Sequence, residues 1–274
     1  MGRLFVIATP IGNLEDVSLR ALRVLAEVRV IAAEDTRTAR VLLDRYGVKG
    51  PRLVSYTDHN AKARIPELLA ALDSGDVALV TDAGTPAISD PGVDLVAAAR
   101  AAGHEVVAVP GPSAVVAALS VAGLPTLNWR FAGFLPRSAG ELRRLIEEQS
   151  QRPETLVAFE SPQRLRKSLA LIAGVMSNRR LAVCRELTKL HEEVFVGTAA
   201  EALAHFETVR GEIVLVIEGG EAERPPEDES ALRDEVGEMR RLGLTQAQAS
   251  ALLSRRYGVS RRRLYQLWLA SERA

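Results

Sequence analysis

The residues with the greatest chemical potential lie at positions 81–92, where two prolines, two glycines and two aspartates stand among three hydroxyl side chains. They follow the apolar run 77–80, which has the composition of a buried parallel strand. Open α/β sheets bind their ligands beyond the carboxyl ends of such strands. Most strand-to-helix connections need only about two to six residues, whereas this one is longer and is stiffened by Pro86 and Pro91. The segment therefore predicts a binding loop, with a simple connection as the alternative.

Two further loops of the same kind follow other expected strands. Residues 9–13 (Thr-Pro-Ile-Gly-Asn) come after the first strand, and residues 110–113 (Pro-Gly-Pro-Ser) come after the fifth. Glycine lets a backbone approach a ligand closely, and proline lowers the entropy lost when a loop holds one shape. Because the carboxyl ends of parallel strands meet at one edge of a sheet, we expect the three loops to converge there.

Several familiar kinds of site are missing from the sequence. No Gly-x-Gly-x-x-Gly follows the first strand, and no Gly-x-x-x-x-Gly-Lys-Ser/Thr occurs anywhere, which argues against the common dinucleotide and nucleoside-triphosphate sites. No His/Cys cluster has the spacing of metal ligands, so no metal is expected. Cys184 lies within an apolar strand and is a poor candidate for a nucleophile.

The elements that must position the loops alternate in type along the chain. In an N-terminal domain at 1–122 we expect strands at 4–8, 28–32, 53–55, 77–81 and 106–109, and helices at 18–26, 38–46, 65–74, 93–102 and 113–121. This βαβ rhythm predicts a mostly parallel sheet. A second α/β domain is expected at 123–219, with strands at 131–134, 155–159, 181–185 and 213–217 and helices at 141–149, 162–173 and 199–206.

The C-terminal part has a different character. Residues 220–230 are rich in Glu, Gly and Pro and predict a linker. Residues 231–274 predict three short helices, at 232–242, 246–257 and 260–271, with Gly258 ending the second and Ser260 capping the third. With Arg261, Arg262 and Arg263 near the turn, the segment is typical of a helix-turn-helix-like appendage that binds nucleic acid. A solvated, arginine-rich helix face is the alternative.

Composition and charge limit the class of protein. Among the 274 residues a single cysteine excludes an intramolecular disulfide framework and fits a reducing cytoplasm. No apolar run approaches the ~20 residues that span a bilayer, and residues 1–10 do not read as a signal peptide, so we expect a soluble cytoplasmic protein with no membrane contact. The net charge of zero hides eight acids against two arginines at 221–238 and eight arginines against one acid at 240–274. The basic tail favours a polyanionic partner.

A series of motifs along nearly the whole chain resembles one known family. The motifs are ATPIGNL at 8–14, AEDTR at 33–37, the loop at 82–92, PGPSA at 110–114, GFLP at 133–136, ESPxR at 160–164 and RELTKLHEE at 185–193. In this order they are similar to the bacterial small-subunit ribosomal RNA 2′-O-ribose methyltransferases of the tetrapyrrole methylase superfamily. The helical tail is also similar to the appendage of that family.

The resemblance implies a fold, a cofactor and a substrate. It implies two α/β domains of the tetrapyrrole methylase type, with S-adenosylmethionine held in the cleft between them, and a homodimer. It also implies methyl transfer to the ribose 2′-hydroxyl of a cytidine in 16S ribosomal RNA near the decoding centre of the small subunit. Where other members have a Gly-Asp-Pro-type loop, this chain has Gly84-Thr85-Pro86, so a hydroxyl replaces an acid.

The resemblance and the expected loop positions together imply contacts with the cofactor from both domains. A helix that begins near Ser113 offers backbone N–H groups to the methionine carboxylate, although Ser113 also reads as a plain helix cap. The expected cofactor-binding residues are Pro10, Gly12, Gly84, Thr85, Ile88, Ser113, Ala114, Phe159, Glu160 and Leu187.

Methyl transfer to a ribose hydroxyl needs a base, or a cation that stabilises the emerging alkoxide. The polar candidates near the cleft are Glu34, Asp35, Arg37, His59, Glu186 and Lys189, of which we favour Lys189 and Glu186 as catalytic. Glu34 and Asp35 fit a helix cap or an ion pair with Arg37 equally well, and residues 59–60 also fit a turn. The residues expected to bind RNA are Arg37, His59, Asn60, Arg261, Arg262 and Arg263.

Two other functions remain open from the sequence. One is a sibling enzyme that methylates a carbon of a tetrapyrrole, which has no evident need for an arginine-rich appendage. The other is a transcription regulator whose α/β body senses a metabolite and whose tail binds DNA. The sequence leaves open which nucleotide is modified, which residue is the base, and whether naked RNA or an assembled subunit is the substrate.

Overall fold

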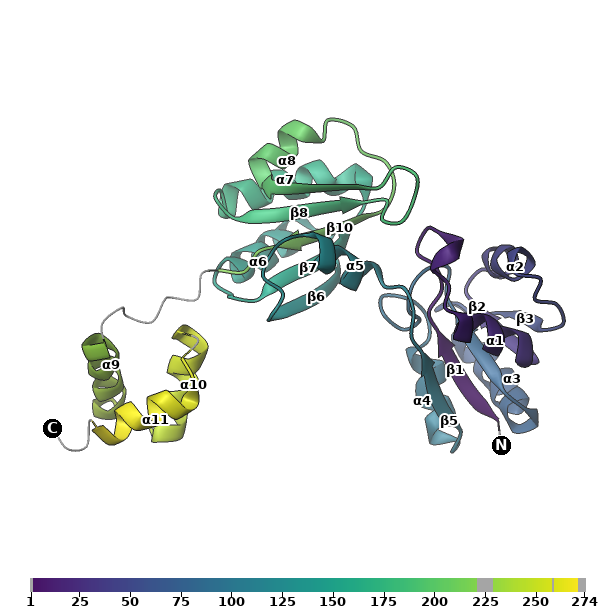
Figure 1. Cartoon of the computed structure of the whole chain (residues 1–274), viewed down its shortest axis with the longest axis horizontal. Helices are drawn as coiled ribbons and strands as arrows, with labels where there is room; N and C mark the ends of the chain where they lie inside the picture. The colour runs from purple at the N-terminus through teal and green to yellow at the C-terminus, as the bar shows by residue number, and fades with distance from the viewer. Residues whose placement is uncertain (1, 221–228, 258, 271–274) are drawn as a thin grey trace.

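The computed structural model describes residues 2–220, 229–257 and 259–270, which form two sheet-containing bodies and a small helical bundle (Figure 1). The first body contains the strands β1 (Arg3–Ile7), β2 (Val30–Ala33), β3 (Arg52–Ser55), β4 (Val77–Val80) and β5 (Glu105–Val109). Its helices are η1 (Leu14–Asp16), α1 (Leu19–Glu27), α2 (Thr36–Arg45), α3 (Ala61–Ser74) and α4 (Val93–Ala101). The expected α/β class is confirmed.

The first sheet is parallel throughout, with the strand order β3-β2-β4-β1-β5. Its central strand β4 is wholly buried, because helices cover both faces and the run Val-Ala-Leu-Val has no polar residue to expose. Crossovers from β1 and from β4 run to opposite sides of the sheet. The loops after these two neighbouring strands therefore flank the switch point at which such sheets bind ligands.

The second sheet has the order β6-β7-β10-β8-β9, formed by β6 (Trp129–Phe134), β7 (Thr155–Glu160), β8 (Arg180–Arg185), β9 (Glu193–Thr198) and β10 (Ile213–Ile217). Only β6 and β7 pair in parallel, and the remaining pairs are antiparallel. The sequence did not indicate β9, an edge strand in which no residue is fully buried. Three helices, α6 (Ala139–Ser150), α7 (Pro162–Val175) and α8 (Ala199–His205), complete this body.

The helix α5 (Ala114–Val121) links the two bodies. Its residues Val115, Ala118 and Leu119 share a buried cluster with Val157 and Val216 of the second sheet. The domain boundary at 122 remains a prediction, but this packing favours dividing the chain before α5 rather than after it.

One helix start differs from its expectation. The helix α3 begins at Ala61, four residues before the expected start at 65, and it contains Pro66 in its interior. The expected start at 65 would put Pro66 in the first turn, where proline is best tolerated. The longer helix brings Asn60 to the N-cap position.

The tail forms a bundle with its own core. Its helices are α9 (Glu229–Arg241), α10 (Gln246–Tyr257) and α11 (Arg261–Ala270), and they pack around Leu232, Val236, Leu253, Leu264 and Trp268. Ser260 caps α11 by accepting the Arg263 N–H, as expected. Residues 221–228, Gly258 and Ser271 lie outside the described residues. No helix of the described part is long and apolar enough to cross a lipid bilayer.

Candidate functional site

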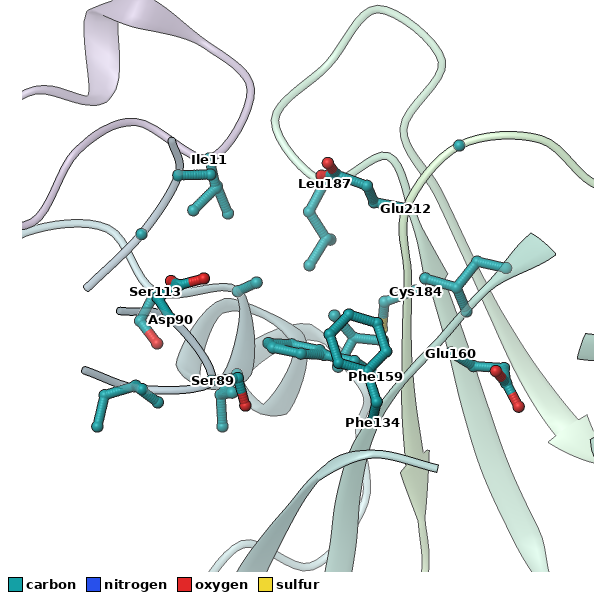
Figure 2. Close-up of a pocket in the computed structure, with 18 of the residues that line it drawn as sticks. Ile11, Ser89, Asp90, Ser113, Phe134, Phe159, Glu160, Cys184, Leu187 and Glu212 are labelled. Carbon is teal, nitrogen blue, oxygen red and sulfur yellow. The ribbon is translucent and has the colours of Figure 1, made fainter. Parts of the chain in front are cut away.

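A cleft of about 370 Å³ lies where the two sheet-containing bodies meet (Figure 2). The first body lines it with Ile11 and with the loop after β4, and the start of the linking helix α5 lies between the two walls. The second body lines it with the ends of β6 and β7, with Leu187, and with residues 211–214 at the start of β10. Most side chains at its centre are apolar or aromatic, so it can hold a small molecule with a few fixed polar contacts.

The three predicted loops converge at this cleft. Thr9 and Gly84 pair across the gap between β1 and β4 through two backbone hydrogen bonds, with N–O distances of 2.8 and 3.0 Å. The Thr85 hydroxyl donates to the carbonyl of Pro112 at 3.3 Å, which ties the second loop to the third. The convergence expected from a parallel sheet is therefore observed.

The loop after β4 holds an unusual backbone shape. Ala87 and Ser89 both adopt positive φ angles, of 71° and 64°, which residues other than glycine rarely do. Such strain persists only where the surrounding structure enforces it, and it concentrates at binding sites. Between them Ile88 remains 48% exposed and lines the cleft. The loop thus presents an apolar side chain to the cleft at an energetic cost.

The start of α5 faces the cleft without a side-chain cap. Ser113 occupies the N-cap position in an extended conformation, yet its hydroxyl makes no capping hydrogen bond. The first N–H groups of a helix have no partner within the helix, and they attract anions. This helix start can therefore receive a carboxylate from a ligand in the cleft.

Aromatic rings form the opposite wall. Phe159 on β7 packs edge-to-face against Phe131 and Phe134, with ring centroids 5.0 and 5.4 Å apart. Phe134 is 60% exposed although it is a large apolar residue, and it lines the cleft together with Phe159 (Figure 2). An exposed ring held in place by a neighbouring ring suits contact with a planar or apolar ligand group.

Glu160 has a structural role in the second body. Its side chain is completely buried, pairs with Arg164 at 2.5 Å, and accepts hydrogen bonds from the Ser161 N–H at 2.7 Å and from the Ser168 hydroxyl. Figure 2 shows its carboxylate directed away from the cleft. Any contact of Glu160 with a ligand is thus left to its backbone, while the sequence had suggested the residue as a whole.

Gly12 and Pro10 lie outside the cleft itself. A Cβ on Gly12 would come within 2.4 Å of Lys189 Cγ and within 3.0 Å of the Leu187 carbonyl oxygen, so the first loop is pressed against the second body. Pro10 instead lines a smaller cavity behind the loop, beside Leu14. Gly12 therefore sets the distance between the two walls of the cleft.

Lys189 and Glu186 form an ion-pair cluster with Glu212 at the edge of the cleft. The Lys189 Nζ lies 2.9 Å from Glu186 Oε1 and 3.1 Å from Glu212 Oε2. Burial lowers the pKa of Lys189, but the hydrogen bonds to both carboxylates outweigh it and the pKa is raised. The Glu212 N–H and Lys189 lower the pKa of Glu186. At neutral pH Lys189 is therefore a cation and not a base, and Glu186 is a weak base.

The polar residues beside α2 and α3 are largely engaged in local structure. Asp35 caps α2 through the Arg37 N–H at 2.8 Å and pairs with the Arg37 side chain at 2.5 Å, contacts that lower the pKa of Asp35 to about 2. Asn60 accepts from the Thr57 N–H at 2.8 Å and donates to the Ser55 carbonyl. The cap and turn alternatives therefore describe Asp35 and Asn60, whereas the Arg37 side chain stays 90% exposed.

Asp90 is a cleft residue to which the sequence assigned no role. Burial and the neighbouring Glu34 raise its pKa to about 6. Burial also raises the pKa of Glu34 itself, against a hydrogen bond from the Asp82 N–H. Asp90 is visible in the sequence of the loop. Only the fold, however, brings the acids that follow β2, β3 and β4 close enough to raise its pKa.

The fold and the cleft define a class of protein. Residues 3–203 match the family model of the Tetrapyrrole (Corrin/Porphyrin) Methylases. Among solved structures, the chain is similar to uroporphyrin-III-C-methyltransferase from Thermus thermophilus, with 24% identity, a TM-score of 0.53, and coverage of 80% of this chain and 94% of that one. It is also similar to the methyltransferase CobJ, with 19% identity, a TM-score of 0.60, and coverage of 80% and 95%. The chain belongs to the tetrapyrrole methylase family.

Curated relatives narrow the group within this family. The proteins named Ribosomal RNA small subunit methyltransferase I from Synechocystis sp. and Pseudomonas aeruginosa are 44% and 43% identical, over 99% and 97% of this chain and 99% and 96% of their own lengths. The one from Thermotoga maritima is 47% identical, and its whole length matches 81% of this chain. Within the tetrapyrrole methylases the chain belongs with these relatives, as the motif series indicated.

Proposed function

We propose that this protein transfers a methyl group from S-adenosylmethionine to the ribose 2′-hydroxyl of a cytidine in 16S ribosomal RNA, near the decoding centre of the small subunit. It acts in the cytoplasm and as a homodimer. The observation that carries the proposal is the cleft, in which an uncapped helix start faces an aromatic wall in a chain whose full-length relatives are named as small-subunit ribosomal RNA methyltransferases.

The residues of the cleft fit S-adenosylmethionine. The start of α5 at Ser113 and Ala114, which no side chain caps, offers its N–H groups to the methionine carboxylate. Thr85 and Gly84 bring the backbone of the second loop close to the ligand, while Ile11, Ile88, Phe159 and Leu187 supply apolar contact. No cluster of metal-ligating side chains occurs among the described residues.

The chemistry then depends chiefly on position. S-adenosylmethionine supplies, when bound, a methyl group on a sulfonium that is open to in-line displacement, and holding the reactants in line provides much of the acceleration. The two walls exclude water from the reacting atoms. Lys189 stays protonated between Glu186 and Glu212, so it can stabilise negative charge on the acceptor oxygen or bind a backbone phosphate.

The tail supplies affinity for RNA. Arg261, Arg262 and Arg263 are all exposed at the start of α11, in a bundle that has its own core. Three adjacent guanidinium groups attract phosphates in any sequence context. Because the Thermotoga maritima relative matches only 81% of this chain over its whole length, this arrangement is an addition to the methylase body and not a condition for the cleft.

The acceptor is tested by offering the protein three substrates with radiolabelled S-adenosylmethionine: small ribosomal subunits that lack the modification, a tetrapyrrole precursor, and duplex DNA. We expect label in the RNA of the subunits and in neither of the others. Label in the tetrapyrrole would show a sibling enzyme. Specific DNA binding without any transfer would show a regulator, and either result would overturn the proposal.

A further inference from the structure

Three acidic residues line the cleft, and their carboxyl groups have different partners. Glu160 is buried in its ion pair with Arg164, and Glu212 pairs with Lys189. Asp90 lines the same cleft, and among the described residues no cation lies within salt-bridge distance of it. Within the described part of the chain, its one hydrogen bond is from the Thr81 hydroxyl to Oδ2, at 3.5 Å, which leaves its other oxygen available to a ligand.

The backbone fixes Asp90 firmly at this place. It stands between Ser89, held at positive φ, and Pro91, whose carbonyl accepts the Ala87 N–H at 3.3 Å. Gly92 follows in close contact, because a Cβ there would lie 3.0 Å from Leu79 Cδ2. The carboxyl group is thus presented by a rigid, strained turn and not by a mobile loop tip. Catalytic groups need such preorganisation.

The charges that face Asp90 from the first body are negative. Glu34 follows β2, Asp58 follows β3, and Asp82 follows β4 on the same loop as Asp90. On the second body the titratable groups of the cleft are Glu160, Glu212 and Cys184, and burial raises the pKa of the Cys184 thiol to about 12. Surrounding negative charge and burial make the Asp90 carboxylate more basic than an ordinary one.

We propose that Asp90 is the general base of the methyl transfer. This inference rests on the proposed function. The O–H bond of the ribose 2′-hydroxyl breaks as its proton passes to a carboxylate oxygen of Asp90, and the oxygen forms the new bond to the methyl carbon. The bond between that carbon and the sulfonium sulfur breaks, its electron pair stays on sulfur, and the sulfonium becomes a neutral thioether. The proton leaves Asp90 to solvent after product release.

The substitution Asp90→Asn tests the role with little change in shape. We expect single-turnover methylation of small subunits to fall by about 100-fold or more, within the range attributed to general bases. Calorimetric affinity for S-adenosylmethionine should stay within about two-fold. Asp90→Glu, which keeps the carboxyl group, should retain more activity than Asp90→Asn. Asp94→Asn, the same change at an exposed position on α4, serves as the matched control with unchanged activity.

Two pH measurements complete the test. The wild-type rate should rise with pH through an inflection near the Asp90 pKa of about 6, and this inflection should be absent from Asp90→Asn. The folded state holds the Asp90 proton more tightly than the unfolded chain does. Ionisation of Asp90 therefore lowers the free energy of unfolding above pH 6. Below about pH 4 Asp90 is protonated in both states, and the free energy of unfolding is not lowered. Asp90→Asn should therefore raise the melting temperature by a few degrees at pH 7.5 and leave it unchanged near pH 4.

An Asp90→Asn variant that methylates within about three-fold of wild type would overturn the assignment, as would an inflection that persists in the variant. A melting temperature that Asp90→Asn leaves unchanged at pH 7.5 would contradict the buried, negatively charged surroundings on which the assignment depends. Failure of the proposed function gives a different pattern, because the wild-type protein would then place no label in ribosomal RNA at any pH.

Discussion

Thr85 connects the sequence to the cleft at the scale of a single residue. Its hydroxyl ties two loops together by donating to the Pro112 carbonyl. Thr85→Arg would place a long cation in the cleft and should lower affinity for S-adenosylmethionine by about 100-fold or more in calorimetry. The circular dichroism spectrum should not change. Thr85→Ser keeps the hydroxyl and should bind nearly as well, whereas equal binding by the arginine variant would disprove the site.

Glu160 offers a test of stability at the same scale. Its carboxylate is fully buried against Arg164, so Glu160→Gln leaves a partly buried guanidinium without its counter-charge. Removal of one partner of a buried pair typically costs about 3 kcal/mol or more of unfolding free energy. Urea unfolding measures this loss. The matched control is Glu147→Gln, which breaks an exposed pair with Arg143 and should cost less than about 1 kcal/mol.

Site residues that belong to one distinctive loop could be predicted from the sequence, whereas roles that depend on residues far away in the chain could not. Thr85, Ile88 and Ser113 belong to loops whose composition is unusual by itself, and each lines the cleft. Asp90 was visible in the same loop, but its perturbation depends on acids that follow other strands. Glu160 lines the cleft as expected, but Arg164 and Ser168, one and two helical turns later, hold its carboxylate within the second body.

At the scale of elements, the contact between the first loop and the second body can be tested through Gly12. A Cβ there meets backbone and side-chain atoms of residues 187–189 at 3.0 Å or less, so Gly12→Ala should push the two walls apart. We expect affinity for S-adenosylmethionine to fall about ten-fold, equivalent to about 1.4 kcal/mol. Gly174→Ala is the control, because no atom lies within 4 Å of its Cβ position within α7. Calorimetry measures the affinity of both variants for S-adenosylmethionine, and equal affinities of the two variants would contradict the contact between the first loop and the second body.

Elements with local signals were predicted, whereas the edge strand β9 and the pairing of the second sheet were not. The wholly apolar strands of the first sheet and the helices between them follow from periodicity, since each crossover imposes the parallel direction on the next strand. The second sheet is mostly antiparallel because β10 enters between β7 and β8, a choice made by long-range pairing. Long-range packing also decides the place of α5, because its apolar residues could cover either sheet and in the structure pack against the second.

At the scale of the whole molecule, the arginines of α11 should govern affinity for RNA while the cleft governs chemistry. Replacing Arg261, Arg262 and Arg263 together by Gln removes three exposed charges without disturbing the core of the bundle. The affinity for small subunits should fall, and the slope of log affinity against log salt should decrease in magnitude by about 2. Filter binding across a salt series measures both, with Gln266→Ala as the neutral control. An unchanged slope would contradict the electrostatic role.

The central claim, that this cleft methylates a ribose oxygen, is tested most directly by the position of the methyl group in the product. Small subunits lacking the modification are incubated with the protein and with S-adenosylmethionine that carries a deuterated methyl group. Their 16S ribosomal RNA is then digested to nucleosides and analysed by mass spectrometry. We predict a single labelled nucleoside, 2′-O-methylcytidine with the deuterated group on the sugar fragment. Label on a base fragment, or the absence of label from the RNA, would contradict the account.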